Sequence, residues 1–211
     1  MAEICKLLYE GGEAANSYLF AKEETGAALL IEGCASVLSV KKALKETGCE
    51  LKAICLTHGH YDHILSLPEL ISAFSCPVYI AKEDAPCLQA GNPANVAWLF
   101  GRQFAGCEAN YLPETGELSL DGIGLKIHFV PGHTAGGVLY ETDDFLFTGD
   151  TLLPGSCGRS DLPTGDEKAL RLSLKKIGAL LQKKDPETIL CTGHGPVVSV
   201  KTELARNMFL K

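Results

Sequence analysis

One short segment, His58-Gly59-His60-Tyr61-Asp62-His63, constrains this chain of 211 residues more than any other. Histidine and aspartate are common metal ligands, and they fill four of these six positions. The segment follows an apolar run at 51–57, which predicts a buried strand, and precedes a run of helical periodicity over 64–74. In α/β proteins, ligands bind beside the carboxyl ends of strands. The segment therefore predicts an α/β fold with a metal site at the end of a central strand.

Size and composition suit a single globular domain over residues 1–211, with 46% apolar and 21% charged residues. The apolar runs are far shorter than the roughly 18 residues of a membrane span, so we expect no membrane partner. The net charge of −7 and the absence of a basic block argue against a nucleic-acid partner. The segment 1–6 lacks the pattern of a signal peptide, and the nine cysteines are scattered without a Cys-x-x-Cys pair. We therefore expect reduced thiols and a cytoplasmic location; the sequence sets no oligomeric state.

Two halves of the chain show a similar order of expected elements. In the first half we expect strands at 4–9, 17–21 and 27–31, a helix over 35–47, a strand at 51–57, a helix over 64–74 and a strand at 77–80. In the second half we expect strands at 117–121, 125–130, 138–141 and 145–148, a helix over 166–181, a strand at 187–191 and a closing helix over 200–210. The less regular stretch 82–110 is interpreted as an insertion or lid over the site. This order predicts two packed sheets with helices outside, a four-layer αββα sandwich.

Three further candidate ligands, His133, Asp150 and His194, each follow an expected strand and a glycine. Glycine allows tight backbone geometry and close approach to a ligand. Each of the three alone would suit a turn or a structural role, but together with the 58–63 segment they predict one metal centre. His128 lies in the middle of an expected strand, so we assign it a structural role.

The donor set contains five imidazoles and two carboxylates and no thiolate. It favours zinc, with iron and manganese as the alternatives. Seven ligands exceed one tetrahedral site, so we expect two metal ions about 3.5–4 Å apart, as in binuclear hydrolases. Because a carboxylate can bridge two ions, Asp150 or Asp62 is expected to span the pair.

The ligand pattern resembles that of the metallo-β-lactamase superfamily and extends over nearly the whole chain. The resemblance implies the same four-layer fold. It also implies a role for each ligand: His58, His60 and His133 bind the first metal, Asp62, His63 and His194 bind the second, and Asp150 bridges them.

Within that superfamily the stretch 149–159, Gly-Asp-Thr-Leu-Leu-Pro-Gly-Ser-Cys-Gly-Arg, is similar to the corresponding segment of glyoxalase II, a hydroxyacylglutathione hydrolase. The resemblance makes Arg159 a candidate for binding a substrate carboxylate; the alternative is a structural pair with Asp161. Several glyoxalase II features are missing: Ser160 and Asp161 replace an aromatic residue, Gly195-Pro196 replaces Glu-Tyr, and only 17 residues follow His194, too few for its C-terminal helical domain. We therefore expect the metal chemistry to transfer better than the glutathione specificity.

The resemblance implies a metal-dependent hydrolase of a small-molecule acyl thioester, such as a hydroxyacylglutathione. A hydroxide bridging two metals would attack the carbonyl carbon. Asp62 would be the catalytic carboxylate that orients this nucleophile or deprotonates the water from which it forms. Three alternatives stay open at this point. One is a persulfide dioxygenase with a single iron on His58, His133 and Asp150. The others are a lactone or β-lactam hydrolase and a structural metal-binding domain.

Overall fold

The first sheet contains the amino-terminal strands in their sequence order. The computed structural model describes residues 3–211. The sheet consists of β1 (Ile4–Leu8), β2 (Ser17–Lys22), β3 (Ala27–Ile31), β4 (Glu50–Cys55), β5 (Val78–Ile80) and β6 (Asn110–Tyr111). β1 to β3 pair antiparallel, and β3 to β6 pair parallel. Parallel neighbours need crossover connections, and α1 (Val37–Thr47) and α3 (Leu67–Phe74) provide two of them.

The second sheet has the order β14-β13-β10-β9-β8-β7. Its strands are β7 (Glu117–Leu120), β8 (Ile123–Phe129), β9 (Val138–Glu141), β10 (Phe145–Gly149), β13 (Ile189–Thr192) and β14 (Val198–Ser199). β10 and β13 pair parallel, with α4 (Glu167–Leu181) in the connection between them. A short hairpin of β11 (Leu152–Leu153) and β12 (Ser156–Cys157) follows β10, and α5 (Val200–Arg206) follows β14.

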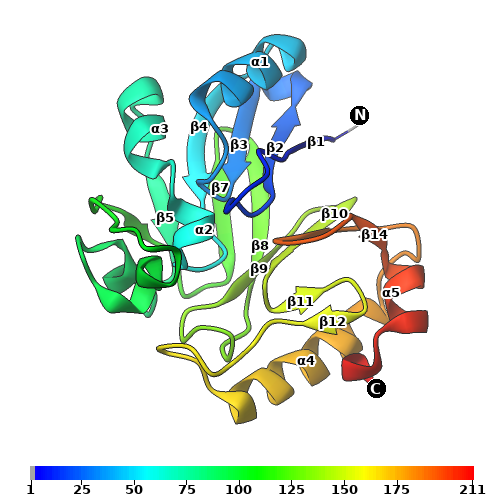
Figure 1. The fold of residues 1–211 in the computed structure, drawn as a ribbon. Coiled ribbons are helices and arrows are strands. Elements are labelled where there is room, and N and C mark those ends of the chain that lie inside the picture. Colours follow the sequence, from blue (N-terminus) through cyan, green and yellow to red (C-terminus); the bar gives the residue numbers. More distant parts are fainter. Residues whose placement is uncertain (1–2) are drawn as a thin grey trace.

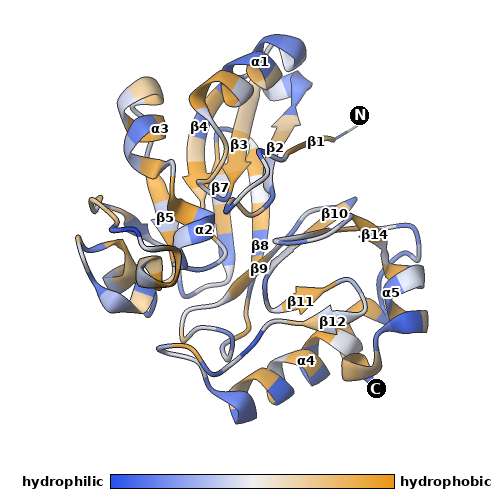
Figure 2. Ribbon diagram, in the orientation of Figure 1, coloured by the Kyte–Doolittle hydropathy of each residue, from blue (hydrophilic) through white to orange (hydrophobic). Residues whose placement is uncertain are grey.

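The apolar side chains form three main layers of core. The layer between the sheets joins residues such as Phe20 and Leu29 of the first sheet to Leu125 and Tyr140 of the second. A second layer packs α1 and α3 on the outer face of the first sheet, and a third packs α4 and α5 on the outer face of the second. Figure 1 shows these two pairs of helices on opposite sides of the molecule. In Figure 2 the helices carry both apolar and polar faces, whereas the inner strands are mostly apolar. The predicted αββα sandwich is confirmed.

The main helices begin where the sequence offers a capping side chain. The Ser36 hydroxyl accepts a hydrogen bond from the Ser39 N–H at the start of α1, and the Asp166 carboxylate accepts one from the Ala169 N–H at the start of α4. Within residues 3–211, none of the helices is long and apolar enough to cross a membrane.

The predicted helix over 64–74 is wrong in one respect, because the structure divides this region into α2 (Tyr61–Ile64) and α3. The two groups that would continue one helix through Ser66 have other partners. The Ser66 N–H donates to the Gly33 carbonyl at 2.9 Å, and the Asp62 carbonyl accepts from the Ala15 N–H at 3.1 Å. Contacts with distant segments therefore interrupt the helix.

The predicted closing helix over 200–210 is also shorter than expected. It ends at Arg206 and gives way to a 3₁₀ turn, η5 (Met208–Leu210). The buried Asn207 explains the break, because its side chain accepts from the Phe209 N–H and donates to the Ser156 carbonyl at 2.7 Å. The stretch 82–110 contains three 3₁₀ turns, η2 (Ala85–Leu88), η3 (Pro93–Asn95) and η4 (Ala97–Phe100), before β6. Its role as a lid stays a prediction.

Candidate metal centre

All seven predicted ligands lie in loops or at a helix start directly after strands. His58 and His60 follow β4, and Asp62 and His63 lie in α2; His133 follows β8, Asp150 follows β10 and His194 follows β13. The structure brings them together in two groups whose potential ligand atoms lie within 4.8 Å of one another: His58, His60 and His133 in one, and Asp62, His63, Asp150 and His194 in the other. The loops of both sheets thus meet at one end of the sandwich.

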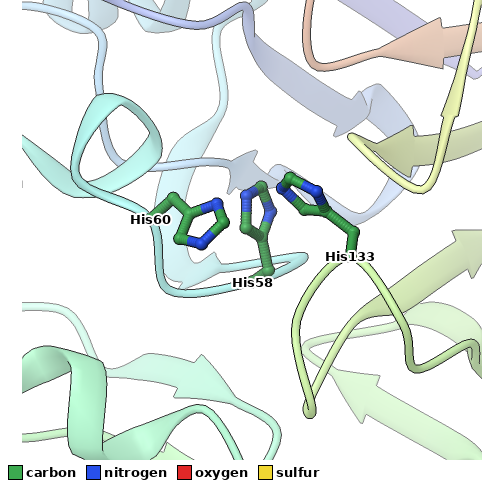
Figure 3. Close-up of side chains that lie close together, drawn as sticks. All are labelled: His58, His60 and His133. Atoms are coloured by element: carbon green, nitrogen blue, oxygen red, sulfur yellow. The ribbon is translucent and has the colours of Figure 1, made fainter. Parts of the chain in front are cut away.

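The first group consists of three imidazoles that point toward one another (Figure 3). The ring centroid of His58 lies 4.8 Å from those of both His60 and His133, and the latter two are 4.6 Å apart. The three Nε2 atoms are buried, and none has a hydrogen-bond partner within the described residues. Buried polar atoms are nearly always satisfied in folded proteins. Three that converge without partners fit a cation coordinated by all three.

Neighbouring groups orient two of these rings. The His58 Nδ1 lies 3.1 Å from the Thr57 hydroxyl, which itself donates to the Glu32 carboxylate at 2.5 Å. The His133 Nδ1 donates to the Arg159 carbonyl at 2.7 Å. Because the Thr57 proton points to Glu32, its oxygen accepts from His58. Both imidazoles therefore keep the proton on Nδ1 and present a free Nε2 lone pair, the usual arrangement at metal sites.

Burial and mutual repulsion favour the neutral forms of His58 and His60. Burial, followed by the nearby His63 and His133, lowers the pKa of His58 well below its usual value. Burial, with His133 next, lowers the pKa of His60 to about 3. Since only the neutral imidazole binds a metal, these shifts prepare the group for a cation at neutral pH.

The second group is rich in carboxylate. The His194 Nε2 lies 3.0 Å from Asp62 Oδ2, and the His63 Nε2 lies 3.3 Å from Asp150 Oδ1. The second oxygen of Asp150 lies 3.5 Å from His194 Nε2 and 3.7 Å from His133 Nε2. The carboxylate of Asp150 therefore lies between the two groups, where a bridging ligand would be.

The carboxylates of this group set its charge. Burial alone would raise the pKa values of Asp62 and Asp150, but His63 and the other neighbouring histidines together outweigh it, and both pKa values are lowered. Burial alone would lower the pKa of His63, yet Asp150, Asp62 and Glu32 raise it well above its usual value. The carboxylates thus favour a positive charge beside them, which a divalent cation would supply in place of the proton on His63.

The loop carrying His194 is fixed by the segment before β2. The buried Asn16 side chain donates to the carbonyls of Thr192 at 3.0 Å and Gly195 at 2.9 Å, and its backbone N–H donates to the Gly193 carbonyl at 2.8 Å. The Tyr18 hydroxyl donates to the Thr192 carbonyl at 2.7 Å. Asn16 therefore positions the His194 loop.

Arg159 and His128 lie outside the two groups. The exposed Arg159 guanidinium donates to Asp161 at 2.6 and 2.7 Å, so the structure shows the structural pair that was the alternative to substrate binding. The His128 Nε2 forms a hydrogen bond with Glu141, which also pairs with Lys184 at 2.7 Å. The structural role predicted for His128 agrees with this contact, and a substrate role for Arg159 stays a prediction.

Several residues that support the ligands were not predicted from the sequence, Glu32 and Thr57 among them. Glu32 is buried, and its Oε1 lies 3.4 Å from the His63 Nδ1 as well as near Thr57. A signal was present, because Glu32 is a lone acid directly after the apolar strand 27–31. Nothing in the sequence indicated a supporting role for Thr57, since it is the last residue of an expected strand.

A fold of two sheets covered by helices, with a His/Asp cluster at one end, defines a metal-binding αββα protein. A sequence profile described as the metallo-beta-lactamase superfamily matches residues 11–194. The chain belongs to this superfamily. It is 34% identical to the "Probable metallo-hydrolase YqgX" of Bacillus subtilis over 174 residues, covering 81% of each protein. It is 32% identical to the "Hydroxyacylglutathione hydrolase GloC" of Haemophilus influenzae, covering 92% of each.

Two solved structures are similar over their full length. The B3 metallo-beta-lactamase BLEG-1 superposes with a TM-score of 0.87 at 28% identity, covering 98% of this chain and 99% of BLEG-1. TTHA1623 in a di-iron-bound form superposes with a TM-score of 0.79 at 31% identity, covering 100% of both chains. The chain is therefore a member of a superfamily of metallo-hydrolases with a His/Asp metal-binding cluster. The donor set does not distinguish zinc from iron.

Proposed function

We propose that the chain is a binuclear metal-dependent hydrolase of a small-molecule acyl thioester, with a hydroxyacylglutathione as the first substrate to test. The observation that carries this proposal is the pair of adjacent ligand groups with the Asp150 carboxylate between them. Similarity to GloC over 92% of the chain supports the thioester as substrate class.

The ligand groups would divide the work between them. His58, His60 and His133 would hold one cation, Asp62, His63 and His194 the other, and Asp150 both. When bound, such cations supply Lewis acidity and lower the pKa of water toward neutrality. We assign Asp62 the role of catalytic carboxylate, because its lowered pKa keeps it ionised and able to orient the attacking water by accepting a hydrogen bond from it. The His194 side chain is 43% exposed whereas His63 is fully buried, so substrate would approach from the side of His194.

The test is thiol release from a hydroxyacylglutathione by protein whose metal content has been measured. A matched pair of variants, His60→Gln and His128→Gln, removes one histidine inside the cluster and one outside it. We expect His60→Gln to lose at least about 100-fold in turnover and one metal equivalent, because a three-ligand group keeps only two ligands. We expect His128→Gln to keep both. Equal activity in His60→Gln and the unchanged chain would contradict the proposal.

The guanidinium of Arg159 donates its hydrogen bonds to Asp161. To bind substrate, Arg159 would have to exchange this partner for the substrate carboxylate. Arg159→Met should raise KM for a thioester with a free carboxylate by about tenfold, through loss of one charge-assisted hydrogen bond. Asp161→Asn should lower the same KM, since it frees the guanidinium. A thioester without a carboxylate is the control, and its KM should not respond. Unchanged KM values in both variants would leave Arg159 as a surface residue.

We propose zinc as the metal, with iron as the alternative supported by the di-iron form of TTHA1623. Metal analysis of protein purified without added metal tests this directly. Oxygen uptake with glutathione persulfide tests the dioxygenase alternative in the same sample. Iron content together with oxygen uptake and no thiol release from thioesters would replace the hydrolase proposal.

A further inference from the structure

Asp84 is a fully buried carboxylate that lies outside the seven predicted ligands. It follows β5, at the start of η2. Its own backbone is fixed, because its N–H donates to the Ala81 carbonyl at 3.0 Å and its carbonyl accepts from the Cys87 N–H at 2.9 Å. Burying a charge is costly unless hydrogen bonds compensate it. The partners of this carboxylate therefore indicate what it does.

The two oxygens of Asp84 accept hydrogen bonds from two different loops. Oδ2 accepts from the Gly59 N–H at 3.1 Å, and Oδ1 accepts from the Gly136 N–H at 2.7 Å. Gly59 lies between His58 and His60, and Gly136 lies three residues after His133. One carboxylate thus joins the two loops that carry all three members of the first ligand group.

These loops come from different sheets, so their spacing is not set by strand pairing within one sheet. The Val138 N–H donates to the Thr57 carbonyl at 2.9 Å. This hydrogen bond joins the two loops at the point where they meet their strands. Asp84 joins them further out, beside the histidines. Gly136 permits this approach, because a Cβ there would lie 2.6–2.8 Å from the N, Cβ and Cγ atoms of Asp84.

We propose that Asp84 is a positioning residue that sets the distance between His133 and the His58–His60 pair, and thereby the metal affinity of the three-histidine group alone. This inference rests on the proposed metal site. The second group should be independent of Asp84 for two reasons. Asp150 and His194 lie on segments that its carboxylate does not join. Asp62 and His63 share a segment with Gly59, but their own backbone is held elsewhere, because their carbonyls accept from the Ala15 and Gly33 N–H groups at 3.1 and 2.7 Å.

The test is metal affinity measured by competition with a chromophoric zinc chelator, without any assay of turnover. Asp84→Asn keeps the shape but leaves one acceptor oxygen for two N–H groups. Residues that orient metal ligands through hydrogen bonds, without binding the metal themselves, typically contribute about 10–100-fold to metal affinity. We expect Asp84→Asn to weaken one of two zinc equivalents by about tenfold or more and to leave the other unchanged. Glu83→Gln, which alters the exposed neighbouring acid, should retain both affinities.

Two backgrounds identify the affected equivalent. In His194→Ala the remaining zinc belongs to the three-histidine group, and adding Asp84→Asn should weaken it by the same tenfold or more. In His60→Gln the remaining zinc belongs to the other group, and adding Asp84→Asn should have no effect. A merely structural role would lower both affinities alike.

The outcomes separate this inference from the proposed function. If the unchanged chain binds no metal, the proposed function fails and the inference fails with it. If it binds two equivalents and Asp84→Asn binds both equally well, or weakens both equally, only the inference is overturned. Should Asp84→Asn not fold, Asp84→Ser, which is smaller and keeps one acceptor, gives the same measurement with the same expected and contrary results.

Discussion

The hydrogen bonds of Asn16 allow a quantitative prediction for the substitution Asn16→Leu. Leucine has a similar size but no donor, so both side-chain bonds to the His194 loop are lost. The two acceptors are affected differently. The Thr192 carbonyl keeps the Tyr18 hydroxyl as a partner, whereas the Gly195 carbonyl has no other hydrogen bond within residues 3–211.

The cost follows from these partners. Each of the two lost bonds costs about 1 kcal/mol, because the Thr192 carbonyl keeps a partner and the exposed Gly195 can bond to water. The sum is roughly 2 kcal/mol in the free energy of unfolding. For a chain of this length each kcal/mol shifts Tm by about 2–4 °C, so we expect Tm to fall by about 4–8 °C.

The assay is thermal unfolding followed by circular dichroism on metal-depleted protein, so that metal binding does not contribute. Asn110→Leu is the matched control, because it makes the same substitution at an exposed position, where changes are usually within about 0.5 kcal/mol. A difference in Tm of about 2 °C is what a change of about 0.5 kcal/mol would produce. If Asn16→Leu and Asn110→Leu melt within about 2 °C of each other, Asn16 does not position the loop as described.

Three further predictions concern the site and its surroundings. Gly193→Ala should abolish binding of at least one metal equivalent, measured by elemental analysis, because its Cβ would lie 2.2 Å from Asp150 Oδ1. Lys184→Met should destabilise the fold by about 1 kcal/mol at pH 7, unlike the exposed control Lys183→Met, since Lys184 pairs with the partly buried Glu141. Partial burial would raise the pKa of Glu141, but hydrogen bonds from Lys184 and His128 lower it overall. The contribution is therefore present above the usual glutamate pKa and lost as pH falls through the lowered one, so denaturant melts of Lys184→Met and the unchanged chain should converge once the pH lies below that lowered pKa. Chelation of the metal should lower the unfolding free energy by about 2.7 kcal/mol when the free metal had been 100 times its Kd.

The sequence allowed the layers of the fold to be predicted, because strand and helix periodicity are local properties. The seven candidate ligands could also be predicted, since His58 to His63 form a dense motif and the other three follow strands; the structure brings them together in two groups, and their binding of metal stays a prediction. The break at Ser66 could not be predicted, because it depends on Gly33 and Ala15, which are distant in sequence. The supporting residues Glu32 and Asp84 were missed for the same reason: a single acid shows its role only when its partners from other segments are known.

The division of the ligands between the two sheets couples metal uptake to assembly of the sandwich. The first sheet supplies His58 to His63, and the second supplies His133, Asp150 and His194. A cation that takes ligands from both sheets would link one half of the polypeptide to the other and stabilise their association. Two fragments divided in the loop between β6 and β7 would each hold an incomplete set, so their association should strengthen when zinc is added.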